Sequence, residues 1–400
     1  MQMSNNTLTN RLITFWNSKN LSIVFFLYVA ISLLAMIQGL AGTPKIYIAG
    51  GRPYTDYNNY VIFKYSFFHL LHNQDIYQYF PNDHWDLYKY SPAFSVFFGL
   101  LGWMPDPVGL FIWHLINCLC LYAGVRMLPG LDNNRKAGIL LFCLLELLLS
   151  IQNTQSNGLM AGLIILGFAL AERSKYALST FCIVFSVYIK LFGGLAFVLY
   201  LFYPNKLRTI GWSIFWMVFM AVLPLILVSP AQLMFLYKSW LHLLSDDRSA
   251  SIGISVMGML DSWFHLSFSK NMVALTGLIL FLLPLIHVRK YQDYYFRLLY
   301  LASILLWIVL FNHKAESPTF VIAMSGIGIW YFCQENTPLG LSLLLLSLFF
   351  VSLSVSDLVP YSIRSGIIKP YAVKALLPAI VWGRLLYEQL SLRYQPQRLI

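Results

Sequence analysis

The sequence predicts an all-α polytopic membrane protein, and three observations support this fold class. Hydrophobic residues make up 58% of the 400 residues and charged residues 11%, whereas roughly a quarter of a soluble domain is charged. Apolar runs follow one another along most of the chain and leave little room for a soluble domain. Aromatic residues make up 16%, and Tyr and Trp gather at membrane interfaces because one end of each ring is apolar and the other is polar.

The apolar runs define the expected helices. A membrane-crossing helix needs about 20 mostly apolar residues, and fewer where it is short or broken. The first run is expected to be retained, because no small-residue cleavage site follows it. We expect about twelve spans, near 21–40, 107–127, 137–151, 157–172, 176–189, 191–203, 209–228, 271–288, 297–311, 318–333, 340–356 and 371–388. They would form a single transmembrane domain over 1–400, with long external segments at 41–106 and 229–270.

Basic residues predict the orientation of these spans. The formal charge is +11, which we attribute to cytoplasmic loops and anionic lipid instead of nucleic acid. Basic residues precede the first span, occupy short connections and end the tail, at Arg11, Lys19, Arg135–Lys136, Arg173–Lys175, Lys206–Arg208, Arg289–Lys290, Arg393 and Arg398. Placing all of them in the cytoplasm satisfies the positive-inside rule. The predicted location is therefore the cell membrane, with multiple passes.

This orientation requires that the apolar segment 92–103 does not cross the membrane. The segment is short and is closed by Met104–Pro105–Asp106–Pro107, so we predict a juxtamembrane or re-entrant helix. The alternative is a true span, which would invert the topology downstream. With the predicted orientation, the most polar connections share the external side, and one concave external site is the simplest explanation. These connections are 41–106, Gln152–Asn157, the helix break at Lys190, 229–270, Asn312–Ser317 and 357–370.

Asp56 is the first candidate for chemistry. It precedes a stretch in which apolar and aromatic residues fall on one helical face, namely Tyr57, Val61, Ile62, Tyr65 and Phe68. Such a helix is expected to lie at the membrane interface, with Asp56 near its N-terminus. The structural alternative is that Asp56 caps this helix, and the two roles can coexist.

Further motifs follow in a fixed order along the chain. They are Asp75–Ile76–Tyr77, Tyr90–Ser91–Pro92, Trp113–Asn117, Gln152–Asn157, Ser179–Gly194 with Lys190 inside it, Ser251–Gly258 and Asn312–Lys314. Together with Asp56, this set resembles glycosyltransferase family 87 of the GT-C superfamily, the polyprenyl-phosphate-mannose-dependent mannosyltransferases. The resemblance spans most of the chain. Two places depart from the family pattern: Phe192–Gly193–Gly194 follows the lysine where a nearby Pro is common, and Thr154–Gln155 interrupts the Gln-x-Asn region.

The resemblance implies a GT-C-like fold and an inverting transferase of the cell envelope with an external, periplasmic active site. It would move a sugar, mannose by analogy, from polyprenyl phosphate to a lipid-linked or glycan acceptor. Transfer to a hydroxyl needs a base, and Asp56 is the candidate. The departing phosphate needs preorganised cations or donors, for which Lys190 and His313 are the candidates. Residues expected to bind the sugar or the acceptor are Gln152, Asn153, Gln155, Asn157 and Glu316.

No cofactor is expected beyond the lipid-linked donor. No paired acids in Asp-x-Asp spacing accompany Asp56, so the sequence gives no support for a metal, and the five cysteines lie in or beside apolar runs without the spacing of a zinc site. Membrane lipids are the other expected partners, and nucleic acid is not. Glu146 lies inside an apolar run and should face a cavity or a partner.

Each candidate also has a structural interpretation. Lys190 could extend its ammonium to the membrane surface, His313 could be an ordinary loop residue, and the amides could cap helices. The alternative function is a transporter or a flippase for lipids or glycans. Such proteins place binding groups near the midplane and show repeats, which the sequence does not. A glycan polymerase or ligase and a non-catalytic scaffold are further alternatives.

Overall fold

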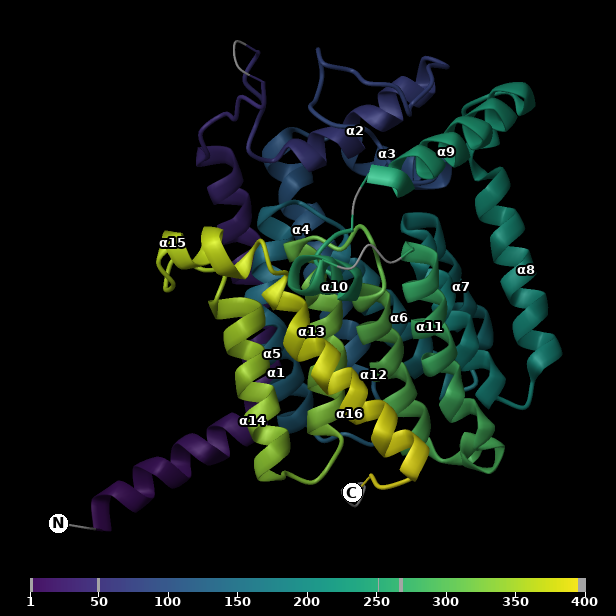
Figure 1. The fold of residues 1–400 in the computed structure, drawn as a ribbon. Coiled ribbons are helices and arrows are strands. Elements are labelled where there is room, and N and C mark those ends of the chain that lie inside the picture. Colours follow the sequence, from purple (N-terminus) through teal and green to yellow (C-terminus); the bar gives the residue numbers. More distant parts are fainter. Residues whose placement is uncertain (1–2, 49–50, 251, 266–268, 395–400) are drawn as a thin grey trace.

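The computed structural model describes residues 3–48, 51–250, 252–265 and 269–394. Long helices run side by side through the molecule, and short helices lie across one end of them (Figure 1). We call the end that carries α2 (Asn58–Leu71), α3 (Pro92–Gly102) and α9 (Pro230–Ala250) the loop end. The opposite end, near both chain termini, is the terminal end.

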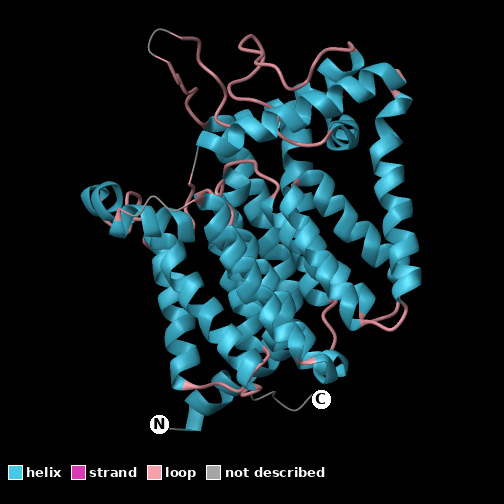
Figure 2. Cartoon of the chain, turned by 45° about the vertical axis from the view of Figure 1, so that its right-hand side comes forward, coloured by secondary structure: helices cyan, strands magenta, loops and turns pink. Residues whose placement is uncertain are grey.

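In the first half of the chain, α2 and α3 of the loop end lie between the first helix and the bundle helices that follow. The remaining helices of this half are α1 (Met3–Ala41), α4 (Asp106–Arg126), α5 (Asn133–Gln152), α6 (Asn157–Ala171), α7 (Tyr176–Ile189) and the 3₁₀-helix η1 (Leu191–Phe202). The one β-bridge in the described residues joins Lys45 to Tyr54. Figure 2 shows that helix dominates the described chain and that the longest connections gather at the loop end.

The second half continues the bundle. Its elements are α8 (Lys206–Val222), η2 (Leu223–Ile226), α9, α10 (Val256–Phe264), α11 (Lys270–Leu282), η3 (Leu283–Ile286), η4 (Val288–Gln292), α12 (Tyr294–Leu310), η5 (Ser317–Thr319), α13 (Phe320–Phe332), α14 (Pro338–Ser347), the π-helix η6 (Leu348–Leu353), α15 (Tyr361–Ile363), the π-helix η7 (Arg364–Ile368), η8 (Val373–Ala375) and α16 (Leu376–Ser391). Each predicted span range overlaps one or more of the described helices.

Burial separates a central group of helices from a peripheral one. In α13, every residue from Phe320 to Tyr331 is buried, and α12 and α6 are buried over nearly their whole lengths. A helix that is apolar all round belongs inside a bundle. In contrast, α8 and α11 expose large apolar side chains such as Ile214 and Met272. Apolar surface of this extent is suited to contact with lipid.

Within the part of the chain that the structure describes, three helical segments are long and apolar enough to cross a membrane, namely Lys19–Ala41, Asp106–Arg126 and Lys206–Ile226. Shorter apolar helices in the described residues, 10–17 residues long, occupy most of the other predicted ranges. The all-helical fold and these segments give the protein the character of a membrane protein, as the composition predicts.

The segment 92–103 forms the short helix α3, as expected. An 11-residue helix rises only about 16 Å, roughly half the thickness of a bilayer core, and α3 lies beside α2 at the loop end (Figure 1). The Ser91 side chain accepts a hydrogen bond from Phe94 N, and Pro92 occupies the first turn. Both are preferred residues at a helix start, so the Tyr-Ser-Pro motif begins this helix.

The segment 229–270, which we predicted to be a long external segment, contains α9 and α10. In α9, Leu233, Leu236 and Trp240 are buried and lie on one helical face because they are spaced by three and four residues. Trp240 Nε1 donates to Lys89 O over 3.0 Å, which holds α9 against the connection before α3.

Candidate functional site

A continuous line of hydrogen bonds joins several predicted site residues at the loop end. Lys190 Nζ donates to Asn157 Oδ1 over 2.8 Å. Asn157 Nδ2 donates to Gln155 Oε1 over 2.6 Å, and Gln155 Nε2 donates to Glu316 Oε2 over 2.7 Å. We call Lys190, Asn157, Gln155 and Glu316 the amide chain. Each amide accepts on its oxygen and donates from its nitrogen, so the chain runs in one direction from ammonium to carboxylate.

Lys190 occupies the predicted helix break. The backbone is extended at Lys190, with φ −144° and ψ 125°, between the end of α7 and the start of η1. Its Nζ lies 5.9 Å from the ring centre of Tyr90 and 5.8 Å from that of Phe192. Ring faces attract cations, so the half-buried ammonium is held by aromatic rings and Asn157. These contacts direct Lys190 to protein groups at the loop end and not to the lipid surface.

Tyr90 is part of the site and was not among the predicted residues. Its hydroxyl lies 3.1 Å from Ser156 Oγ, directly beside the start of α6. Tyr77 OH donates to the Tyr90 backbone oxygen over 3.0 Å. Tyr90 thereby connects the motif before α3 to the amide chain. The available signal was its place in the Tyr90–Ser91–Pro92 motif, which we used only as one part of the family resemblance.

The loop 152–157 is anchored by α4. Thr154 has a left-handed backbone, with φ 50°, and its carbonyl accepts a 2.9 Å hydrogen bond from Trp113 Nε1. Asn117 Oδ1 accepts from Leu159 N over 2.9 Å in the first turn of α6. The Trp113–Asn117 motif therefore positions the backbone that presents Gln155 and Asn157. A left-handed conformation in a non-glycine residue persists only where its surroundings enforce it.

The other predicted amides point elsewhere. Gln152 Nε2 donates to Gln38 Oε1 on α1 over 2.7 Å. Asn153 Nδ2 donates to Leu149 O over 2.9 Å, at the end of α5. In the described residues neither side chain joins the amide chain. For Asn153 the structural interpretation, helix capping, therefore accounts for the contact.

Asp56 lies directly before α2. The N-cap position is Tyr57, without a side-chain cap, so the interpretation of Asp56 as the helix cap is wrong. Asp56 Oδ1 instead lies 2.5 Å from Lys45 Nζ, and the bridge between Lys45 and Tyr54 brings this lysine into place. The Asp56 side chain is 28% exposed, so solvent can reach it. Lys45 has no distinguishing motif, and sequence reasoning missed it.

Asp56 and the amide chain belong to neighbouring, linked segments. In the described residues Asp56 makes no hydrogen bond or ion pair with the amide chain. However, Asn59 Nδ2 donates to Asn153 O over 2.8 Å, and Tyr60 N donates to Thr154 Oγ1 over 3.1 Å. The first turn of α2 is thus docked on the loop that carries Gln155.

His313 and Glu316 lie in one loop between α12 and α13. This loop is held by the small-residue segment, because Ile254 N donates to Ala315 O over 2.7 Å. Gly253 has φ +59°, and a Cβ atom there would lie 2.8 Å from His313 O. Glycine is therefore required at this close approach. Glu316 joins the amide chain, and His313 lies three residues before it.

The side-chain donors and acceptors of the amide chain are suited to binding hydroxyl and phosphate groups. A lysine ammonium, amide groups and a carboxylate offer charge and hydrogen bonds in both directions. No group of three or more His, Cys, Asp or Glu side chains that could hold a metal ion occurs within the described ranges.

Comparison with known proteins assigns the family. Residues 88–356 match the profile described as Glycosyltransferase family 87. No curated protein matches the chain. The matched range includes the whole amide chain and His313, begins after Asp56 and ends before the last helix. Because the match covers well over half of the sequence, the chain belongs to glycosyltransferase family 87.

Proposed function

We propose that this glycosyltransferase is an inverting hexosyltransferase of the GT-C type. It moves mannose from a polyprenyl-phosphate donor to a lipid-linked or glycan acceptor at the external face of the cytoplasmic membrane. The observation that carries the proposal is the amide chain, which fixes the Lys190 ammonium at the end of the apolar helix α7. A donor with an apolar tail and a phosphate head has both of its parts matched there.

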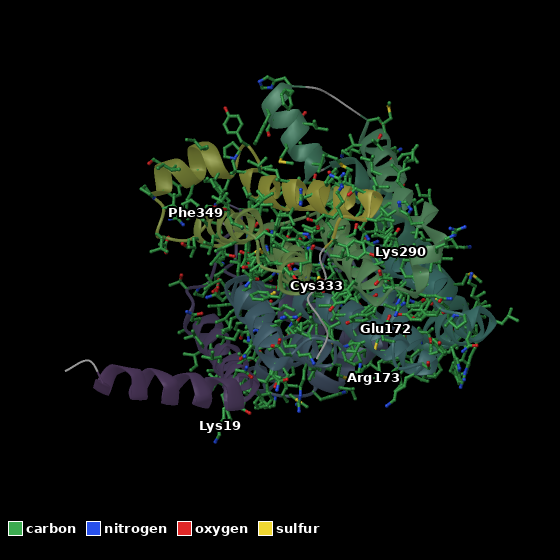
Figure 3. All side chains as sticks on the ribbon, turned by 90° about the horizontal axis from the view of Figure 1, so that it is seen from below. Lys19, Glu172, Arg173, Lys290, Cys333 and Phe349 are labelled. Atoms are coloured by element: carbon green, nitrogen blue, oxygen red, sulfur yellow. The ribbon has the colours of Figure 1, made fainter. Side chains whose placement is uncertain are left out.

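The proposed topology has twelve crossings, with the terminal end in the cytoplasm. Seen from the terminal end, Lys19, Arg173 and Lys290 lie on this face (Figure 3). Both termini are also at this end (Figure 1), as an even number of crossings requires. Lys and Arg collect in cytoplasmic connections, so this distribution supports an external loop end.

The proposed reaction is a single displacement. The acceptor hydroxyl oxygen attacks the anomeric carbon, and Asp56 accepts the hydroxyl proton. The bond between the anomeric carbon and the phosphate oxygen breaks, and polyprenyl phosphate leaves with the bonding electron pair. Lys190 and His313 stabilise the growing negative charge. The amides and Glu316 bind sugar or acceptor hydroxyls.

The test is transfer from polyprenyl-phosphate mannose by the purified full chain in detergent. Asp56→Asn should abolish transfer while expression and thermal stability are retained. Asp86→Asn is the matched control, because Asp86 is exposed in the same external segment and its φ of +74° is a conformation that Asn accepts readily. Normal transfer by Asp56→Asn would exclude Asp56 as the base. Lipid movement across vesicles without glycoside formation by the wild-type protein would favour the flippase alternative.

A further inference from the structure

A buried ion pair lies behind the loop of Glu316. Lys374 in η8 and Glu146 in α5 are each 1% exposed. Lys374 Nζ donates to Glu146 Oε1 over 3.0 Å and to Oε2 over 2.8 Å. It also donates to Ser317 Oγ over 2.8 Å. An ammonium has three N–H donors, so all three are satisfied and none is left for a ligand.

Ser317 links this ion pair to the candidate site. Ser317 is the first residue of η5 and directly follows Glu316, whose carboxylate accepts from Gln155 at the end of the amide chain. The Lys374 ammonium therefore binds the residue that directly follows Glu316, whose carboxylate orients the amide chain. Fixing Ser317 restricts where the Glu316 backbone can lie.

The segment before Lys374 is attached to the other support of the same loop. Trp263 Nε1 donates to Tyr371 O over 2.6 Å, and a Cβ atom on Gly258 would lie 3.6 Å from the Ala372 Cβ. Trp263 and Gly258 belong to the segment 252–264, in which Ile254 N donates to Ala315 O. The loop 312–317 is thus held on one side through Ile254 and on the other through Lys374.

Stability alone does not explain this ion pair. Removing two charges from water is costly, and well-packed apolar residues in place of a buried ion pair are often neutral or stabilising. What the pair supplies that apolar residues would not is a directed hydrogen bond to Ser317. Lys374 also lies beyond residue 356, where the family match ends, so the family assignment gives it no role.

We infer that Lys374, held by Glu146, is a positioning residue for sugar transfer. It fixes Ser317 and through it the Glu316 carboxylate, so that the amide chain keeps the Lys190 ammonium in its reactive position. This inference rests on the proposed function, because it assigns Lys374 to the same site. Lys374 contacts neither donor nor acceptor.

The test uses a charge-free double variant and a single hydroxyl deletion in the purified full chain. Glu146→Gln with Lys374→Met removes both charges and approximately retains volume, and Ser317→Ala removes only the hydroxyl acceptor. Each should lower kcat for transfer from polyprenyl-phosphate mannose by roughly 10- to 100-fold, because small misplacements have effects of this size. The KM for the donor should change less than the kcat. Ser325→Ala, a buried serine eight residues further along in α13, is the matched control and should keep the wild-type kcat.

Two readouts separate this inference from the proposed function. If the double variant has the wild-type kcat per folded molecule, the positioning role is overturned. Absence of transfer by the wild-type protein would overturn the proposed donor instead. In that case hydrogen exchange at backbone amides 312–319 decides. Faster exchange in the double variant and unchanged exchange in Ser325→Ala support the tether, and equal exchange in all three proteins overturns it.

Discussion

Each end of the bundle contains a buried Glu side chain paired with a cationic side chain, but the neighbours of the two pairs differ. At the loop end, Lys374 binds Glu146 and reaches the loop of Glu316 through Ser317. At the terminal end, Arg297 Nε and Nη2 bind Glu172 over 2.6 Å and 2.7 Å. The Glu172 carboxylate also accepts from Tyr203 OH over 2.7 Å. This second pair connects the ends of α6, η1 and α12, and no predicted site residue belongs to it. A buried ion pair therefore does not mark a site unless its neighbours carry reactive groups.

The terminal end also has a cavity of about 290 Å³ between α13, α14 and α16. Its wall includes Glu388, whose carboxylate accepts from Trp330 Nε1 over 2.8 Å and from Arg384 Nε over 2.7 Å. The cavity does not border the amide chain. The presence of this cavity alone would favour the terminal end, whereas the directed line of hydrogen bonds favours the loop end. We therefore propose that function lies at the loop end and structural support at the terminal end.

The largest effect that we expect is on stability at the terminal end. Arg297→Met leaves the Glu172 charge buried without its cation, and such changes cost about 3–5 kcal/mol. Thermal unfolding in detergent should show a clear fall in Tm. Transfer per folded molecule should stay at the wild-type level.

The double variant Glu172→Gln with Arg297→Met is the control and should recover most of the Tm. If Arg297→Met instead abolished transfer without lowering Tm, the terminal end would take part in the chemistry. The division between the two ends would then be wrong.

The second effect concerns the loop end and has the opposite signature. Lys190→Met removes the proposed cation for the phosphate, and losing one preorganised donor typically lowers kcat about 10²–10³-fold. The Tm should change little, because Lys190 is only half-buried. Lys369→Met is the control, since Lys369 is exposed at the end of η7, and it should keep the wild-type kcat. A large loss of Tm with a normal kcat in Lys190→Met would make this lysine structural.

The sequence predicted the helices better than the site because apolar length is a local property. Lys190, Asn157, Gln155 and Glu316 were each named, but their connection was not, since Gln155 and Glu316 stand 161 positions apart. The partner of Glu146 was expected without being identified, because Lys374 is 228 positions away. Lys374 does carry a signal, since it is an ionisable residue in an apolar run. Only the folded arrangement shows which distant groups meet.

The third prediction concerns pH and the segment 41–106. Burial and the neighbouring His69 lower the pKa of His84 from 6.5 to about 4, although Asp83 and Asp86 act to raise it. The folded protein therefore keeps His84 neutral where the unfolded chain becomes protonated. Above pH 6.5 His84 is mostly neutral in both states and the free energy of unfolding is not reduced. As the pH falls towards 4, protonation favours the unfolded chain, and the free energy of unfolding decreases by roughly 3 kcal/mol at most.

The measurement is Tm as a function of pH between 7.5 and 4, in conditions spanning these pKa values. His84→Asn is the control, because an Asn amide can replace the His84 Nδ1 hydrogen bond to Asp86 O. Its Tm should depend less on pH. An identical pH profile in the variant would show that His84 does not control the stability of the segment 41–106.

The smallest effect tests how closely the loop of His313 must fit. Gly253→Ala would place a Cβ atom 2.8 Å from His313 O at a φ of +59°, and the left-handed backbone alone costs a non-glycine residue about 1–2 kcal/mol. We expect a small fall in Tm and a roughly tenfold loss of kcat, because the displaced loop also carries Glu316. Gly211→Ala is the matched control: no atom lies within 4 Å of its added Cβ, and alanine favours the helix there. If both variants transfer sugar at the wild-type rate, the loop end tolerates displacement and its supports serve only the fold. If only Gly253→Ala slows transfer, the position of this loop is part of the catalytic arrangement. Adding one carbon atom would then lower kcat at the loop end, whereas substitution at the terminal end lowers only the Tm.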